Sequence, residues 1–162
     1  QQFDPVGNYS VTALFTPSGG GAEVALNEIQ YNPSRRAESG DWVELHNTSS
    51  QLASISGWEL RDENSAFVIP AGTSIPAGGY LVLAQDQSAF SAQFPTVTNV
   101  IGDLGFGLAG SGERVELHSP GGLHDFVEYD DSSPCPTGPD GGRTSLELID
   151  PRTDHAPPPS FA

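Results

Sequence analysis

The side chains of this chain that are best suited to chemistry are carboxylates. Four of them lie close together in the C-terminal third: Glu128, Asp130, Asp131 and Asp140. Calcium takes about six to eight oxygen ligands, many of them from Asp and Glu in loops. The four residues are therefore candidate ligands of a structural calcium ion, although their spacing is not that of a dedicated calcium loop. A plain acidic surface explains the same residues and is the favoured interpretation.

Trp42, Glu44 and His46 form a second group with potential chemistry. They alternate with Val43 and Leu45 in the run WVELHN, and alternate residues of a strand share one face. Two interpretations remain open. Glu44 either makes an ion pair with a neighbouring strand, or the three side chains form an exposed strip that binds a ligand.

Asp125 is expected to be partly buried, because it shares a strand face with Val127 and Tyr129. A buried carboxylate needs hydrogen-bond partners. We expect Arg143 or backbone amides to supply them, and we prefer this structural role to a catalytic one.

Histidine and cysteine give weaker signals. His118 and His124 flank a predicted hairpin turn, but zinc needs a full tetrahedral set of ligands. Cys135 is the only cysteine, and no base or helix start is predicted beside it to activate the thiol. The sequence has neither a nucleophile elbow nor an H-E-x-x-H motif. The Gly-rich run 105–110 lacks the flanking strand and helix of a nucleotide loop, so no catalytic site is predicted.

The charge of the chain is strongly negative. Its 162 residues include 21 Asp and Glu against 6 basic residues, all of them Arg, for a formal net charge of -15. This balance disfavours nucleic acid and anionic lipid, which require a basic surface, and favours divalent cations. No apolar run approaches the roughly 20 residues of a membrane span. Residues 1–5 lack the basic start of a signal peptide.

The elements that must position these residues are mostly strands. Short alternating runs between Gly, Pro, Asn and Asp turns are typical of an all-β sandwich. We expect strands over 24–32, 42–47, 52–60, 67–69, 80–84, 114–118, 123–129 and 146–149, a short helix over 85–93 and a loop over 99–107.

The sandwich is expected to span residues 23–151. Residues 1–22 read as an arm or the end of a preceding domain, with a strand over 8–17 and a Gly-rich linker. Residues 152–162 read as a Pro-rich tail.

The order of these runs resembles the lamin tail domain, most closely its bacterial extracellular branch. The likeness covers about residues 24–151 and rests on NEIQYNP, GDWVELHN, SGWEL, FVIPAGTSIPAGGYLVLA, SGERVELHSPGG, DFVEYDD and SLELIDP. It implies an immunoglobulin-like β-sandwich that serves as an accessory module of secreted or surface proteins. Cys135 departs from the family pattern, since relatives commonly have an aromatic residue there.

The resemblance and the acidity together favour a non-catalytic module of a secreted or cell-surface bacterial protein. Such a module would contact proteins or tether neighbouring domains, by its sheet edges and loops. A hydrolase fragment is a rival hypothesis, and it would require Glu44, Asp125 and His118 to converge in a cleft.

The other rival is a carbohydrate-binding module, with or without structural calcium. It would use Trp42, Tyr31 or Tyr80 as a stacking platform, and it requires these rings to be exposed. Trp58 is expected in the core, because a sandwich of this type places a large aromatic side chain between its sheets.

Overall fold

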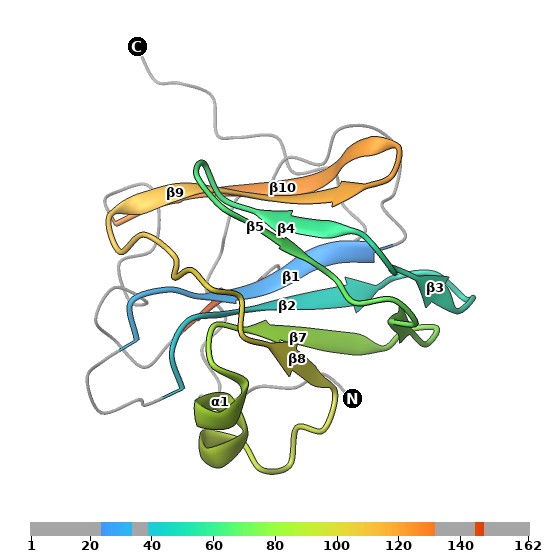
Figure 1. Ribbon diagram of the computed structural model, residues 1–162, viewed down its shortest axis with the longest axis horizontal. Coiled ribbons are helices and arrows are strands. Elements are labelled where there is room, and N and C mark those ends of the chain that lie inside the picture. The colour runs from blue at the N-terminus through green and yellow to red at the C-terminus, as the bar shows by residue number, and fades with distance from the viewer. Residues whose placement is uncertain (1–23, 34–38, 132–144, 148–162) are drawn as a thin grey trace.

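A computed structural model describes residues 24–33, 39–131 and 145–147, which form two packed β-sheets and one short helix (Figure 1). Sheet A contains, in spatial order, β11 (Leu146–Glu147), β1 (Val24–Gln30), β2 (Trp42–Asn47), β7 (Tyr80–Ala84) and β8 (Val100–Gly102). Sheet B contains β10 (Gly122–Asp130), β9 (Gly112–Ser119), β4 (Glu59–Arg61) and β5 (Ala66–Val68). A small ribbon pairs β3 (Ala53–Ser54) with β6 (Ser74–Ile75). The expected immunoglobulin-like β-sandwich is confirmed.

A β-bulge in β1 decides which of its residues face the core. The register with β2 shifts between Leu26 and Glu28, so Leu26 lies opposite Leu45 while Ile29 lies opposite Val43. An extra residue in one strand reverses the alternation beyond it. The bulge therefore turns both Leu26 and Ile29 toward sheet B.

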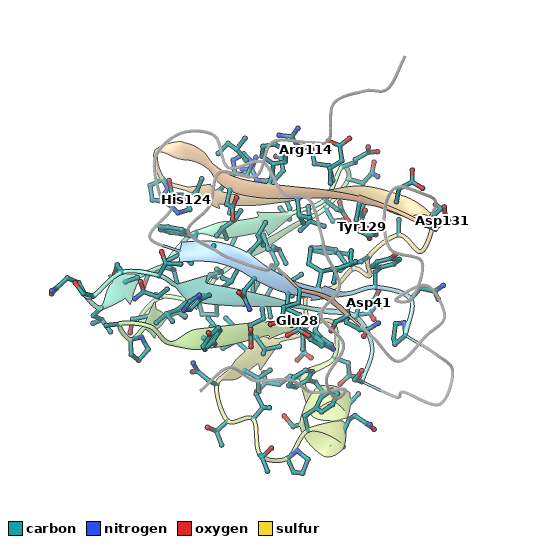
Figure 2. All side chains as sticks on the ribbon, turned by 180° about the vertical axis from the view of Figure 1, so that it is seen from behind. Glu28, Asp41, Arg114, His124, Tyr129 and Asp131 are labelled. Atoms are coloured by element: carbon teal, nitrogen blue, oxygen red, sulfur yellow. The ribbon has the colours of Figure 1, made fainter. Side chains whose placement is uncertain are left out.

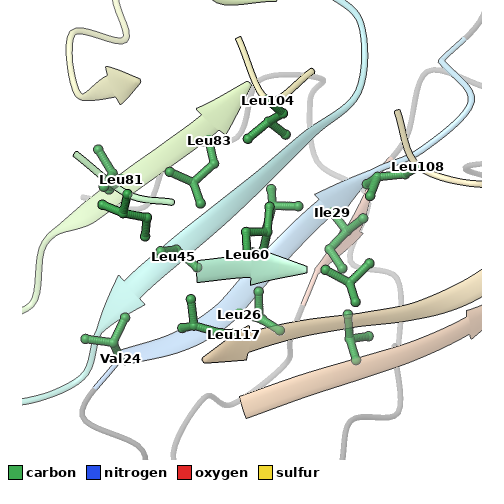
Figure 3. Packing of buried hydrophobic residues seen from close by; sticks show 14 of the residues in the cluster. Val24, Leu26, Ile29, Leu45, Leu60, Leu81, Leu83, Leu104, Leu108 and Leu117 are labelled. Carbon is green, nitrogen blue, oxygen red and sulfur yellow. The ribbon is translucent and has the colours of Figure 1, made fainter. Parts of the chain in front are cut away.

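The core lies between the two sheets (Figure 3). Leucine, isoleucine and valine side chains from both layers fill it, and the rings of Tyr31 and Tyr129 meet with their centroids 4.2 Å apart. Full burial of one such aliphatic side chain contributes about 1.5–3 kcal/mol. Trp58 packs against this cluster while remaining partly exposed.

A second apolar cluster covers the other face of sheet A. Trp42 packs edge-on against Phe90 of α1 (Gln87–Gln93), with ring centroids 5.8 Å apart, and Val82 and Ala84 of β7 join them. The helix begins where the sequence predicts it, because the Asp86 side chain accepts a hydrogen bond from the amide of Ala89 at 2.8 Å.

The expected loop over 99–107 is wrong in part, because it contains β8. This strand pairs with β7 in parallel, with Val82 opposite Val100. Two parallel neighbours need a crossover connection, and α1 provides it.

The expected strand over 52–60 is also divided. Gly57 has a φ of 75°, a conformation that suits glycine and ends the extended run, so β3 and β4 are separate strands. The expected strand over 8–17, the arm and the tail lie outside the described residues.

Candidate functional site

The exposed strip of Trp42, Glu44 and His46 is not formed. Trp42 is 1% exposed and Glu44 is 0% exposed, because the outer face of sheet A is covered. His46 is half-buried and stacks flat on Tyr80, with ring centroids 4.2 Å apart. The sequence pattern identified the shared face correctly, but it could not show that this face is buried.

Glu44 lies in a row of three glutamates that crosses sheet A. Glu28 is directly opposite Glu44 on one side and opposite Glu147 on the other (Figure 2 labels Glu28). Glu44 Oε1 accepts a hydrogen bond from the Asn27 amide at 2.8 Å, so its partner is not the cation of an ion pair. The second oxygen, Oε2, is buried without a hydrogen-bond partner. Burial, with a smaller effect from Glu147, raises the pKa of Glu44 to about 7.

The stacking platform expected for a carbohydrate-binding module is likewise absent. Tyr31 lies in the core between the sheets, and Trp42 lies beneath α1. Tyr80 is half-buried, and His46 covers its ring. The three rings therefore share no exposed surface.

Asp125 is buried at 4% exposure, and it links the two sheets. Its Oδ2 accepts a hydrogen bond from the amide of Leu26 in β1 at 2.8 Å, and its Oδ1 accepts one from the amide of Phe126 at 2.9 Å. Burial outweighs these two hydrogen bonds and raises the pKa of Asp125 to about 6. Backbone amides are thus its partners in the described structure, and Arg143 lies outside it.

His124 extends this connection between the sheets. A bulge in β10 at this position lets His124 and Asp125 both reach β1, and His124 Nε2 lies 3.1 Å from the carbonyl oxygen of Val24. Val24 and Leu26 present their backbone groups on the same edge of the strand. Two side chains of β10 therefore occupy an edge of β1 that would otherwise pair with another strand.

His118 does not join His124 in a zinc site. Its ring lies 2.7 Å from Glu116 on the outer face of sheet B, whereas His124 reaches across to sheet A.

The three residues that a hydrolase site would require also lie on different faces of the sandwich. Glu44 lies on the outer face of sheet A, Asp125 between the sheets and His118 on the outer face of sheet B.

The described structure includes three of the four predicted calcium ligands. Glu128, Asp130 and Asp131 are exposed at the end of β10 (Figure 2 labels Asp131), and Asp140 lies outside the described residues. Within the described ranges no three His, Cys, Asp or Glu side chains are arranged to hold a metal ion.

The Gly-rich run 105–110 is fixed by the protein's own carboxylates. The amide of Leu108 donates to Asp41 Oδ2 at 2.7 Å, and the amide of Ala109 donates to Glu113 Oε1 at 2.7 Å. Phosphate-binding loops need such amides to be available. Both amides are occupied here by carboxylates, which would also repel a phosphate.

Asn47 organises the end of the sandwich that carries β3 and β6, whereas the sequence pattern placed it only at the end of the expected strand over 42–47. Its side-chain amide donates to the carbonyl oxygens of Gln51 at 2.7 Å, Ile75 at 2.9 Å and Pro76 at 3.0 Å. Its Oδ1 accepts from the Ser49 amide at 3.0 Å. One buried residue thereby holds two loops together.

The loops at this end of the molecule contain no charged side chains. Its segments are residues 47–58, 67–80 and 119–123, and none of them contains Asp, Glu, Lys or Arg. We call it the neutral end; the β3–β6 ribbon and the β9–β10 turn mark it at the right of Figure 1. The exposed large apolar side chains of the described structure all fall in these segments: Leu52 at 67%, Val68 at 57% and Leu123 at 38%. Glu59 and His118 lie between Val68 and Leu123 in the strand register of sheet B. Uncharged runs in so acidic a sequence were the signal that could have revealed it.

Comparison with known families agrees with this architecture. A family model of the lamin tail domain matches residues 17–131, well over half of the chain. The chain belongs to the lamin tail domain family. Lamin tail domains are immunoglobulin-like, non-enzymatic interaction domains. No curated protein matches the sequence.

The charges of this lamin tail domain gather away from the neutral end. The opposite end, at the other termini of the strands, carries carboxylates in the turns beside β2, β4, β8, β9 and β10: Asp41, Asp62, Glu63, Asp86, Asp103, Glu113, Asp130 and Asp131. We call it the acidic end. Burial raises the pKa of Glu113 there, and repulsion from Asp62 and Asp41 adds a smaller increase.

The outer face of sheet B in this lamin tail domain carries alternating charges. Arg61 Nε donates to Glu59 at 2.7 Å, and Arg114 Nε donates to Glu116 at 2.7 Å while its guanidinium lies 3.8 Å above the Phe126 ring. Arg61 and Arg114 are the two arginines in the described residues, and each is paired with a carboxylate. Among all the described residues, no helix is long and apolar enough to cross a membrane.

Proposed function

We propose that this lamin tail domain is a non-catalytic interaction module of a secreted or cell-surface bacterial protein. It contacts protein partners or holds neighbouring domains in position. Membership of an interaction-domain family supports the first part. The net charge of -15 and the complete lack of lysine support an extracellular setting, where high charge favours solubility.

One observation carries the proposal: the side chains with potential chemistry are separated and serve the fold. Asp125 receives two backbone amides, Glu44 receives Asn27, and His118 lies beside Glu116. A hydrolytic site needs an acid, a base and a nucleophile within reach of one substrate atom. Side chains on three different faces of the sandwich do not meet that requirement.

The surface of the described residues favours protein over nucleic acid and polysaccharide as the partner. Nucleic acid requires unpaired basic residues, and both described arginines are paired. Polysaccharide recognition requires exposed rings, and Tyr31 and Trp42 are buried. The neutral end offers exposed aliphatic side chains, which suit a protein surface.

The test immobilises the purified domain and measures its binding to two materials. The first is a bacterial cell-surface protein fraction, before and after protease treatment, and the second is a panel of polysaccharides that includes peptidoglycan. We expect binding that protease abolishes and no retention by polysaccharide. Retention by polysaccharide, or turnover of glycoside, ester or phosphodiester substrates, would contradict the proposal.

A further inference from the structure

We propose that the outer edge of β5 binds an extended segment of a partner protein, which joins sheet B as an additional strand. This inference rests on the proposed interaction function and names the edge and the chemical class of its partner. β5 is the last strand of sheet B in the described structure, and β4 is its neighbour on the inner side (Figure 1). An open strand edge binds other extended chains through backbone hydrogen bonds.

The register of β4 and β5 decides which backbone groups of β5 point away from the sheet. The amide of Ile69 donates inward to the Trp58 carbonyl oxygen at 2.8 Å. Inward-bonding and outward-facing residues alternate along an antiparallel strand, so Phe67 also bonds to β4. Ala66 and Val68 therefore direct their amide N–H and carbonyl groups outward.

The outward-facing residues of β5 are accessible. Ala66 is exposed, and so is the side chain of Val68. Glu59 and Arg61 of β4 lie opposite Val68 and Ala66, and they form an ion pair with each other. A guest strand beside β5 would therefore extend the ladder without separating an ion pair.

Three other edges in the described structure are less accessible than that of β5. The side chains of His124 and Asp125 occupy backbone groups of β1. On β10 the Phe126 amide donates to Asp125, and the charged side chains of Glu128 and Asp130 follow on the same strand. β8 is half-buried along its whole length. Capping groups and charges protect strand edges from pairing, and β5 carries neither.

Backbone geometry selects an extended polypeptide as the occupant. The N–H and C=O groups of an edge strand are spaced to pair with another extended backbone, whereas a helix has already used its own backbone groups internally. All described pairings within sheet B are antiparallel, so we expect an antiparallel guest. Pairing ends at Pro70, which has no amide N–H to donate.

Charge indicates the sequence of the guest. Asp62 and Glu63 lie in the turn before β5, and the C-terminal end of an antiparallel guest lies beside this turn. A short run of β-branched residues followed by Lys or Arg would complement both Val68 and the two carboxylates. A second copy of β5 fits less well. Its residues 69–72 would lie beside the turn and contain no basic residue, and each copy has a charge of -15.

The experiment follows amide hydrogen exchange of the full chain by NMR, with and without a synthetic peptide. The peptide alternates valine and threonine and ends in two lysines at its C-terminus. In the free protein we expect rapid exchange at Ala66 and Val68 and slow exchange at Phe67. Saturating peptide should slow exchange at Ala66 and Val68 at least about tenfold, because their amides become hydrogen-bonded.

A peptide of reversed sequence tests the orientation of the guest. Its lysines stand at the N-terminus, away from Asp62 and Glu63. It should bind at least about threefold more weakly at about 0.05 M sodium chloride, and the difference should disappear at about 0.5 M, where charges are screened. Equal binding of the two peptides at low salt would contradict the proposed guest sequence.

Two variants of one residue locate the contact. Val68→Pro removes an outward-facing amide, which an edge strand tolerates, and should weaken peptide binding at least about tenfold. Val68→Thr keeps the amide and the β-branched shape, and it should bind the peptide within about threefold of wild type. Thermal unfolding checks that both variants fold. If Val68→Pro does not fold, the exchange pattern of the wild-type protein decides the question.

Slow exchange at Ala66 and Val68 in the free protein would overturn this inference, as would peptide binding that a folded Val68→Pro variant leaves intact. Analytical ultracentrifugation without peptide tests the remaining occupant. A dimer that Val68→Pro dissociates would assign the edge to a second copy and overturn the inference as well.

The proposed interaction function has a separate outcome. Protease-sensitive binding to the surface fraction without any effect of the peptide refutes the β5 edge alone. Loss of both results refutes the interaction function too.

Discussion

Single buried carboxylates govern how this domain should respond to pH. Glu44 and Asp125 are both removed from water, and burial raises the pKa of each, to about 7 and about 6. A carboxyl whose pKa is raised in the folded state binds its proton more tightly there than in the unfolded chain. Its contribution to stability is therefore complete below the unfolded pKa and is lost as the pH rises through the folded pKa.

The substitution Glu44→Gln isolates the contribution of the carboxylate row. Glutamine retains the oxygen that accepts from Asn27 and offers an amide beside Glu28 and Glu147. We expect the free energy of unfolding of the wild-type domain to fall between about pH 4.5 and about pH 7 more steeply than that of the variant, by about 1.4 kcal/mol for each unit of pKa shift. Urea unfolding across this range measures it. Parallel pH profiles for the two proteins would contradict the explanation.

The substitution Asp125→Ala tests the link between the sheets. It leaves the amides of Leu26 and Phe126 without their acceptor, at a cost of about 1–3 kcal/mol for each buried group left unpaired. Glu128→Ala is the matched control, because Glu128 lies on the same strand and is exposed. Urea unfolding should show a large loss for the first variant and a change of less than about 0.5 kcal/mol for the second. Equal losses would mean that Asp125 has no special role.

At the level of elements, the unit β7–α1–β8 has a tight packing requirement. A Cβ atom on Gly102 would lie 2.8 Å from the Ala84 carbonyl oxygen and 2.9 Å from Gln87 Cβ. Gly102 is therefore needed because β8 and the start of α1 approach each other closely.

Gly102→Ala should accordingly push α1 away from sheet A and destabilise the domain by about 1–3 kcal/mol. Trp42 packs against Phe90 of this helix, so its fluorescence should shift to longer wavelength. Gly121→Ala serves as the control, since a Cβ there meets only Ser119 Oγ, at 3.5 Å. An unchanged spectrum and stability for Gly102→Ala would show that the close approach is not restrictive.

Much of the element structure was predictable because it follows from period-two alternation and turn residues. The run WVELHN, the Tyr80–Ala84 strand and the Asp86 helix start carry these signals locally, and the structure agrees with them. β8 could not be predicted, because it has three residues and its partner lies on the far side of a helix. The division between β3 and β4 depends on the backbone conformation of Gly57, which alternation does not reveal.

The candidate site was less predictable, since burial of a sheet face depends on what packs over it. Alternation placed Trp42, Glu44 and His46 on one face correctly but could not show that the face is covered. The parity of Asp125 predicted its burial, because Val127 and Tyr129 on the same strand mark the core side. The hydrogen bonds of the Asn47 side chain join loops that are far apart in sequence, so no local pattern predicts them.

For the molecule as a whole, net charge should dominate the response to ions. With a charge of -15, sodium chloride should raise the melting temperature by screening repulsion, and calcium chloride at matched ionic strength should raise it equally. Differential scanning fluorimetry with and without chelator measures both. A larger rise with calcium, reversed by chelator, would instead indicate a specific site and bring Asp140 back into consideration.

The contact of His124 and Asp125 with β1 has a consequence for proteins that carry several β-domains in a row. Adjacent domains risk exchanging strands while they fold, because open backbone edges recognise one another without regard to sequence. Here the edge at Val24 and Leu26 and the amide of Phe126 are already occupied by side chains of the same domain. A newly synthesised neighbouring domain therefore finds no unpaired backbone groups at this edge of β1, which favours folding of each domain on its own.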